Sequence, residues 1–161
     1  MRDDQESLEA FVSSRRPALF RSAYLLCGDR DEADDLVQST LVKVVLGWRR
    51  LERIDNVEAY ARKTLVNTFI ASRRRFWRRE APYAQLPASA PPLTDPETGI
   101  DVRSALQSLT AHQRAVIVLR YWEDLTVGQT AAVLNMRENT VKSHAARAMA
   151  ALRAQIREVA A

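Results

Sequence analysis

The chain has 161 residues, 47% of them hydrophobic and 27% charged, which is the composition of an ordinary soluble globular protein. Its one cysteine, Cys27, excludes an intramolecular disulfide and a multi-cysteine zinc site, and no apolar run approaches the roughly 20 residues that span a bilayer. The N-terminal residues 1–6 contain no apolar signal segment, so a cytoplasmic location is expected. The net charge of +4 is compatible with a polyanionic partner without being diagnostic of one.

The first 48 residues predict three helices. A short helix is expected over Ser7–Ser14, and a second over Pro17–Cys27, with the proline in its first turn and Gly28 after its end. Asp29 or Asp31 is expected to cap a third helix, which continues to about Trp48. Its apolar residues follow three- and four-residue spacing and are expected to face inward: Ala33, Leu36, Val37, Leu41, Val44, Val45 and Trp48.

Acidic residues crowd the start of this third helix. They are Asp29, Asp31, Glu32, Asp34 and Asp35. The positive end of the helix dipole explains the placement of each one taken singly. Paired carboxylates also serve acid–base chemistry or metal binding, but no histidine or further cysteine clusters with them, so we expect no catalytic site here.

A loop is expected from Gly47 to Val57, followed by a helix from Val57 to Arg79 with Asn56 as its N-cap. The inner face of this helix carries Ala61, Leu65 and Phe69, and its outer face is basic and polar. Its end, residues 75–79, interleaves Phe76 and Trp77 with arginines. That pattern suits a single-stranded nucleic acid, and it also fits a solvated helix end whose rings pack back onto the core.

Residues 81–99 differ sharply in composition from the rest, because they contain five of the six prolines of the chain. A helix cannot persist through such a stretch, so we predict an extended, flexible linker. The expected fold is therefore all-α, with one helical domain over residues 1–80 and a second over residues 100–161, each with a modest core.

The second domain is expected to open with a short helix whose inner face carries Val102, Ala105, Leu106 and Leu109. Thr110 and Gln113 form a capping box for the next helix. Its inner side is predicted to carry Val116, Ile117, Leu119 and Tyr121, and its wetter side Arg114 and Arg120. His112 and His144 lie far apart in the sequence with no acidic or thiol partners at ligand spacing, so no metal site is expected.

Residues 125–147 read as a short helix, a tight turn and a second helix. Thr126 and Gln129 form another capping box, and Ala131, Ala132 and Leu134 supply a small apolar face. Asn135 tolerates the left-handed backbone that ends a helix. The second helix is expected to run from about Glu138 to Arg157, and its outer face carries Asn139, Thr140, Lys142, Ser143, His144 and Arg147.

This pattern is typical of a helix-turn-helix whose second helix enters a DNA major groove. The alternative is an αα-hairpin with a merely solvated polar face. The DNA interpretation is favoured because no acid occurs between Glu138 and Glu158, and because arginine, lysine, asparagine, serine and threonine pair with phosphates and base edges.

Three segments carry a family resemblance. Leu26–Gln38 resembles the signature L-x-G-D-x-x-x-A-E-D-L-V-Q, with Asp34 in place of glutamate. Tyr60–Asn67 resembles W-L-x-x-I-A-x-N, with Tyr60 in place of tryptophan, and Thr140–Ala148 resembles T-V-K-S-R-x-x-R-A, with His144 where arginine is frequent. In this order they cover nearly the whole chain, which resembles the extracytoplasmic-function (ECF, group IV) sigma factors of the sigma-70 family, closest to a subgroup common in actinobacteria.

The resemblance implies a protein that binds core RNA polymerase and directs it to promoters, with no cofactor or metal and no catalysis of its own. It implies that Asp34, Asp35 and Gln38 meet the clamp helices of the largest polymerase subunit. The minus-ten element, opened with a flipped base, would be recognised by Asn56, Tyr60, Lys63, Asn67, Arg73 and Arg74. The minus-thirty-five element would be read by Arg137, Asn139, Thr140, Lys142, Ser143, His144 and Arg147. Members of the family are commonly inhibited by an anti-sigma factor.

His144 departs from the family pattern in a way that bears on specificity. An arginine there can make a bidentate contact to guanine, which contributes about 1–3 kcal/mol of discrimination. Histidine cannot fork in this way. We expect His144 to contact a phosphate or a single base edge, or else to be solvated and to touch nothing.

Two other classes of protein remain as alternatives. A two-component-type regulator often ends in a similar helix-turn-helix, but its receiver domain would show strand runs where this N-terminal half predicts helices. An enzyme that binds RNA or single strands would use the stretch of arginines and aromatics, but no nucleophile–base pair, glycine-rich phosphate loop or metal set supports catalysis.

Overall fold

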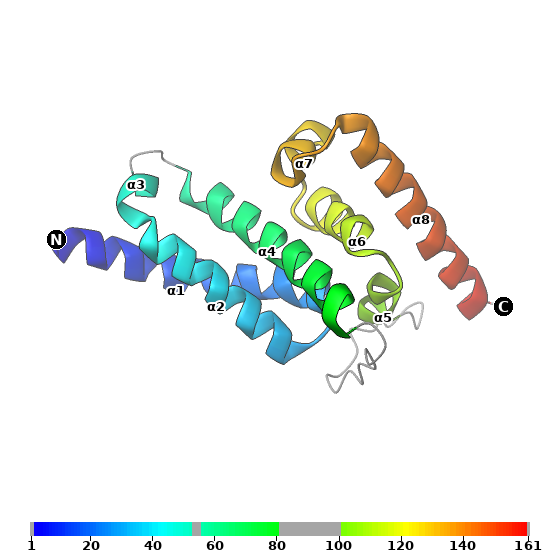
Figure 1. Cartoon of the computed structure of the whole chain (residues 1–161), viewed down its shortest axis with the longest axis horizontal. Coiled ribbons are helices and arrows are strands. Elements are labelled where there is room, and N and C mark those ends of the chain that lie inside the picture. Colours follow the sequence, from blue (N-terminus) through cyan, green and yellow to red (C-terminus); the bar gives the residue numbers. More distant parts are fainter. Residues whose placement is uncertain (1, 53–55, 81–100, 161) are drawn as a thin grey trace.

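The computed structural model describes residues 2–52, 56–80 and 101–160. Among these residues every regular element is helical (Figure 1). The first group of helices comprises α1 (Arg2–Cys27), α2 (Arg30–Leu46), α3 (Trp48–Glu52) and α4 (Val57–Glu80). The second comprises α5 (Val102–Gln107), α6 (Ala111–Ile117), the π-helical turn η2 (Val118–Trp122), α7 (Val127–Leu134) and α8 (Glu138–Ala160). The all-α prediction is confirmed, and the predicted linker at 81–99 lies outside the described residues.

The N-terminal segment forms one helix where two were expected. Helix α1 continues through Pro17, which removes one backbone donor from the helix. Residues 13–18 are all exposed, so the carbonyl that loses its partner can bond to water instead. The prediction of two separate helices was wrong, because the exposed backbone carbonyl can bond to water and the hydrogen bond lost at Pro17 therefore costs little stability.

The loop expected from Gly47 to Val57 is partly helical. Helix α2 ends at Leu46, Gly47 caps it, and the five-residue helix α3 follows. Trp48 and Leu51 are buried, at 8% and 4% exposure, so this turn is anchored by apolar packing that the loop prediction did not anticipate. Residues 53–55 lie outside the described part of the chain.

The two capping boxes and two helix caps are confirmed. Thr110 and Thr126 each accept from a backbone N–H three residues on, and Gln113 and Gln129 accept in return. The carboxylate of Asp29 caps α2 by accepting from the N–H of Glu32 at 3.0 Å, and Asn56 caps α4 more loosely. Local side-chain chemistry therefore defines where these four helices begin.

The side-chain orientation in the second group differs from the predictions at several positions. Val102, Tyr121 and Ala132 are exposed, although each was expected on an inner face, and Arg114 is 6% exposed, although it was expected on a wetter side. The π-helical turn at 118–122 shifts the register after Leu119, which places Tyr121 outward.

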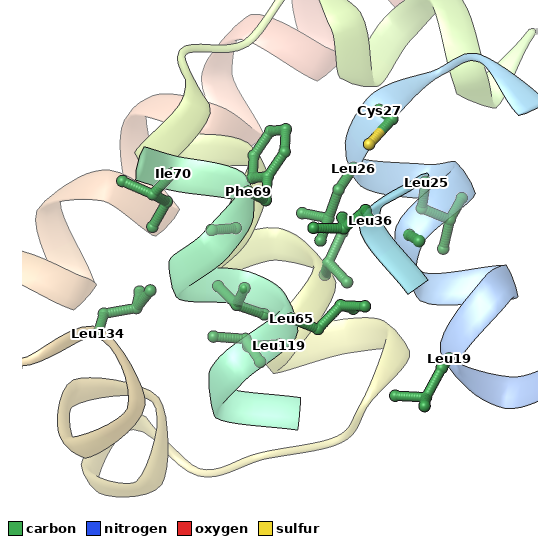
Figure 2. Close-up of a cluster of buried hydrophobic side chains, with 14 of the residues drawn as sticks. Leu19, Leu25, Leu26, Cys27, Leu36, Leu65, Phe69, Ile70, Leu119 and Leu134 are labelled. Carbon is green, nitrogen blue, oxygen red and sulfur yellow. The ribbon is translucent and has the colours of Figure 1, made fainter. Parts of the chain in front are cut away.

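The two helical groups share one buried core (Figure 2). Phe69 and Leu65 of α4 lie at its centre, flanked by Leu26 of α1 on one side and by Leu119 and Leu134 of the second group on the other. Helix α4 contacts both α6 and α7. The side of α4 that faces the second group is therefore covered by protein in this structure.

Candidate nucleic-acid interface

Helices α7 and α8 form the expected helix-turn-helix. Asn135 ends α7 in the left-handed conformation, with φ 53° and ψ 51°, and its N–H bonds to the carbonyl of Ala131. This residue reverses the chain in a few positions, so that α8 packs across α7 and α6. Val141 and Ala148, both fully buried, anchor α8 on its inner side.

The opposite side of α8 is open. Six of the seven residues predicted for the minus-thirty-five element are exposed: Arg137, Asn139, Thr140, Lys142, Ser143 and Arg147. Three of them are cationic, and the others carry short side chains with hydrogen-bonding groups. This is the combination that contacts phosphates and reads base edges.

His144, the seventh, is placed differently. It is half-buried and its ring stacks on that of His112 at the start of α6, with 5.9 Å between centroids and 17° between planes. Its Nδ1 is buried without a hydrogen-bond partner. Burial, followed by the charges of His112 and Arg147, lowers the pKa of His144, so the ring is neutral at pH 7. Tertiary structure thus pairs two histidines that the sequence separates by 32 positions.

Helix α4 presents the residues predicted for the minus-ten element in unequal ways. Lys63 and Arg74 are exposed, Asn56 is exposed at the helix start, and Tyr60 is half-buried. The side-chain amide of Asn67 donates to the carbonyl of Val133 on α7 at 3.1 Å. The side chains of residues 76–80, including Phe76 and Trp77, lie outside what the structure describes, so their two interpretations stay open.

Arg73 has its guanidinium engaged within the protein. It donates to the carbonyl of Cys27 at 3.1 Å and to the carboxylate of Glu32 at 3.0 Å, and it lies 5.4 Å from the centre of the Phe69 ring. Its side chain is only 14% exposed. The structure therefore gives Arg73 a role in holding α4 against α1 and α2.

The acidic residues of α2 divide into two sets. Asp29 caps the helix and Glu32 pairs with Arg73, whereas Asp34, Asp35 and Gln38 are exposed. Farther along the helix, Val42, Val45 and Leu46 are 56%, 48% and 83% exposed. Gln38, Val42 and Val45 follow one another at spacings of four and three residues, so they share a face. Sequence reasoning counted Val45 among the inward residues and missed this apolar extension.

Two expected absences can be examined only over the described residues. There, no group of three or more histidine, cysteine, aspartate or glutamate side chains has a geometry that holds a metal ion. None of the helices in the same residues is long and apolar enough to cross a membrane. Cys27 is buried, and burial raises its pKa to about 12, which keeps the thiol protonated.

Comparisons with known proteins agree with this arrangement. Residues 11–79 match the family described as Sigma-70 region 2, and residues 100–152 match Sigma-70, region 4. The chain is 38% identical to an RNA polymerase sigma-E factor of Streptomyces coelicolor over 156 residues, which is 92% of this chain and 85% of the relative. It is 30% identical to the ECF RNA polymerase sigma factor SigL of Mycobacterium tuberculosis, over 94% of this chain and 90% of that one.

Solved structures share the fold. The sigma factor RpoE from Bartonella quintana, in complex with the anti-sigma factor NepR, matches with a TM-score of 0.73 and 26% identity over 99% of both chains. CnrH in complex with the cytosolic domain of CnrY matches with a TM-score of 0.66 at 22% identity, over 96% of this chain and 90% of that one.

The chain belongs to the sigma-70 family of RNA polymerase sigma factors, in its ECF group. It is a promoter-recognising transcription initiation factor, with α1–α4 covering the region 2 match and α5–α8 the region 4 match.

Proposed function

We propose that this sigma factor binds promoter DNA and core polymerase through three separate surfaces. The exposed face of α8 reads the minus-thirty-five element, the face of α4 with Lys63, Asn67 and Arg74 recognises the minus-ten element, and the α2 face with Asp34, Asp35 and Gln38 binds core polymerase. The observation that carries the proposal is α8, whose buried Val141 and Ala148 orient five exposed polar and cationic side chains to one open side, with the exposed Arg137 just before the helix. On this proposal the chain catalyses no reaction itself, and it acts in the cytoplasm beside the polymerase.

The α8 assignment is tested by quantitative binding of promoter fragments to the reconstituted holoenzyme. Arg147→Ala and Lys142→Ala are expected to weaken binding to the matching promoter at least fivefold. A phosphate contact lowers affinity uniformly across sequences and reduces the salt dependence, whereas a base contact relaxes the preference at one position. Arg153→Ala, an exposed change two helical turns farther along α8, is the matched control and is expected to have no such effect. Equal promoter affinity of all three variants would overturn the assignment of α8 to the minus-thirty-five element.

The polymerase surface combines charge with exposed apolar area. Contiguous exposed apolar side chains commonly mark protein interaction sites, and Val42 and Val45 continue the face that carries Gln38. Asp35→Lys is expected to weaken holoenzyme assembly at least tenfold, and Val45→Ser several-fold, measured by fluorescence anisotropy with labelled sigma factor. Asp31→Lys changes an exposed acid in the first turn of the same helix and serves as the control. Loss of binding in the control alone would contradict the proposed surface.

A protein inhibitor is proposed as a second partner. The support is that solved relatives of this fold were captured with anti-sigma factors, NepR on RpoE from Bartonella quintana among them. Affinity capture of the tagged full chain from its own cells, followed by mass spectrometry, tests this. Recovery of core polymerase subunits with no further stoichiometric protein would count against an inhibitor.

A further inference from the structure

His144 lies at the boundary between the inner and outer sides of α8. It follows the fully buried Val141 by three positions and precedes the fully buried Ala148 by four, so it shares their face of the helix. On its other side it adjoins Ser143 and Arg147, which are exposed residues of the proposed DNA surface. The place of His144 against the rest of the domain therefore determines where Ser143 and Arg147 lie.

One edge of the His144 ring points into the protein. Its Nδ1 is buried, and this atom has no hydrogen-bond partner among the described residues. Its face stacks on the ring of His112 at the start of α6, with 5.9 Å between the centroids. The sequence led us to expect either a DNA contact or a ring that touches nothing. The structure instead gives His144 a partner within the protein.

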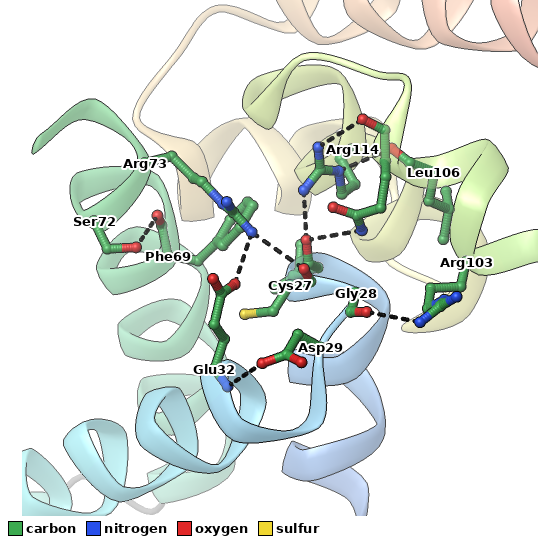
Figure 3. A network of polar contacts seen from close by, with 12 residues as sticks. Cys27, Gly28, Asp29, Glu32, Phe69, Ser72, Arg73, Arg103, Leu106 and Arg114 are labelled. Atoms are coloured by element: carbon green, nitrogen blue, oxygen red, sulfur yellow. Dashed lines mark hydrogen bonds and ion pairs between the residues drawn. The ribbon is translucent and has the colours of Figure 1, made fainter. Parts of the chain in front are cut away.

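The start of α6, where His112 lies, is fixed by side-chain contacts. A capping box closes its first turn at both the N-cap and the third helical position. Arg114, two positions after His112, donates to the carbonyl of Leu106 on α5 at 2.9 Å (Figure 3). His112 is therefore a fixed point of contact for the middle of α8.

The contact between the two rings depends on their charge. The titratable groups whose charge acts on the His144 ring are His112 from α6 and Arg147 from α8 itself. Burial first, and then these two groups, lower the pKa of His144, because a proton on the ring would be poorly solvated and repelled from both sides. The neutral ring leaves Arg147 as the cation at this part of α8.

We propose that His112 is a positioning residue for reading the minus-thirty-five element: through its stack on His144 it holds the middle of α8 against α6 and so sets where Ser143 and Arg147 meet the DNA. The inference rests on the proposed function, because it deepens the assignment of α8 to that element. Two protonated imidazole rings repel each other, so the stack weakens in acid. A histidine that only contacted a phosphate would behave in the opposite way, because its protonation would strengthen DNA binding.

The quantity to measure is discrimination, defined as the ratio of two dissociation constants of the reconstituted holoenzyme. One is for a matching promoter fragment with a scrambled minus-thirty-five element, and the other is for the intact fragment. A ratio cancels any change in the active fraction of a variant. His112→Ala and His144→Ala each remove one ring, and both are expected to lower discrimination about three- to tenfold at about pH 7.5.

Phenylalanine at either position separates positioning from DNA contact. His112→Phe and His144→Phe each keep a neutral ring for the stack but remove the polar ring nitrogens, so they are expected to retain discrimination within about twofold. If His144 contacted a base or a phosphate, His144→Phe would lose that contact and would behave like His144→Ala.

The pH profile gives a second readout that a merely structural contact would not move. Lowering the pH from about 7.5 to about 5.5 is expected to reduce wild-type discrimination about threefold or more, because imidazole rings protonate in this range. His112→Phe is expected to remove this dependence, because a protonated His144 is attracted to the face of a phenyl ring.

Full discrimination in His112→Ala, equal losses in His144→Phe and His144→Ala, or stronger wild-type discrimination at the lower pH would each overturn the inference. Arg147→Ala distinguishes its failure from that of the proposed function. If Arg147→Ala weakens promoter binding while His112→Ala leaves discrimination unchanged, the inference alone fails. If neither variant has an effect, the assignment of α8 to the minus-thirty-five element fails as well.

Discussion

Arg114 on α6 donates a hydrogen bond of 2.6 Å to the carbonyl of Leu26 at the end of α1, across 88 positions of sequence. The same guanidinium donates to the carbonyls of Leu106 and Leu109 at 2.9 and 3.0 Å and lies 5.6 Å from the centre of the Phe69 ring. Burial lowers the pKa of Arg114 to about 10, which still leaves it charged at neutral pH. The Arg114 side chain thus donates to backbone carbonyls at the C-terminal ends of two helices, α1 in region 2 and α5 in region 4.

Replacement of Arg114 by leucine is expected to lower the free energy of unfolding by about 2–4 kcal/mol, because several buried carbonyls lose their donor together. Urea denaturation followed by circular dichroism measures the loss. Arg153→Leu, an exposed change on α8, is expected to stay within about 0.5 kcal/mol of the wild type. A loss at Arg114 no larger than at Arg153 would show that water replaces the guanidinium without cost.

The thiol of Cys27 is expected to resist alkylation in the native protein. It is 8% exposed, and burial raises its pKa to about 12, so the reactive thiolate is scarce. Between about pH 9 and pH 12 the unfolded chain releases this proton while the folded chain keeps it, so folding stability falls as pH rises. Mass spectrometry after iodoacetamide treatment with and without urea tests the first point. The stability difference between wild type and Cys27→Ala across that pH range tests the second.

His112→Ala is expected to raise the pKa of His144 toward its ordinary value, because it removes the stacked ring that helps to bury His144 and that disfavours its charge. The chain has only two histidines, so the variant leaves one ring signal to titrate by NMR. In the wild type the unfolded chain binds this proton first, so the stability present above about pH 6.5 declines as pH falls. Arg137→Ala is the control. An unmoved titration in His112→Ala would contradict the stacked geometry.

Asn135 holds a left-handed conformation that alanine adopts with difficulty, so Asn135→Ala is expected to cost about 1–2 kcal/mol. Asn135→Gly relieves that strain while loosening the unfolded chain, and is expected to change stability by only a few tenths of a kcal/mol. The midpoints of thermal unfolding of the two variants give the comparison. An alanine variant as stable as the glycine variant would mean that the turn relaxes.

The accuracy of the sequence predictions followed the range of the interactions involved. The capping boxes at Thr110 and Thr126 and the left-handed turn at Asn135 were predicted correctly, because each depends on residues within about four positions. The apolar spacing of α4 was sufficient to place Leu65 and Phe69 in the core. The prediction of a helix boundary near Pro17 was wrong, because the cost of a proline inside a helix depends on solvent exposure. The spacing of apolar residues in the sequence gives no information on that exposure.

The candidate interface was predictable where function uses an exposed helix face, as on α8. It was not predictable where a polar side chain found a distant partner. Arg114 looked like a solvated cation, Arg73 and Asn67 like free DNA contacts, and His144 like an isolated ring, yet each contacts an element far away in the sequence.

By itself the sequence determined the helical class, most helix ends and the two-region organisation of this sigma factor, since these arise from local propensity, periodicity and capping. Only the tertiary structure decided which polar groups remain free to meet DNA and polymerase. Which polar groups remain free depends on which of them donate to the buried carbonyls at helix ends. Such a carbonyl accepts its hydrogen bond from a side chain of whichever helix packs against it.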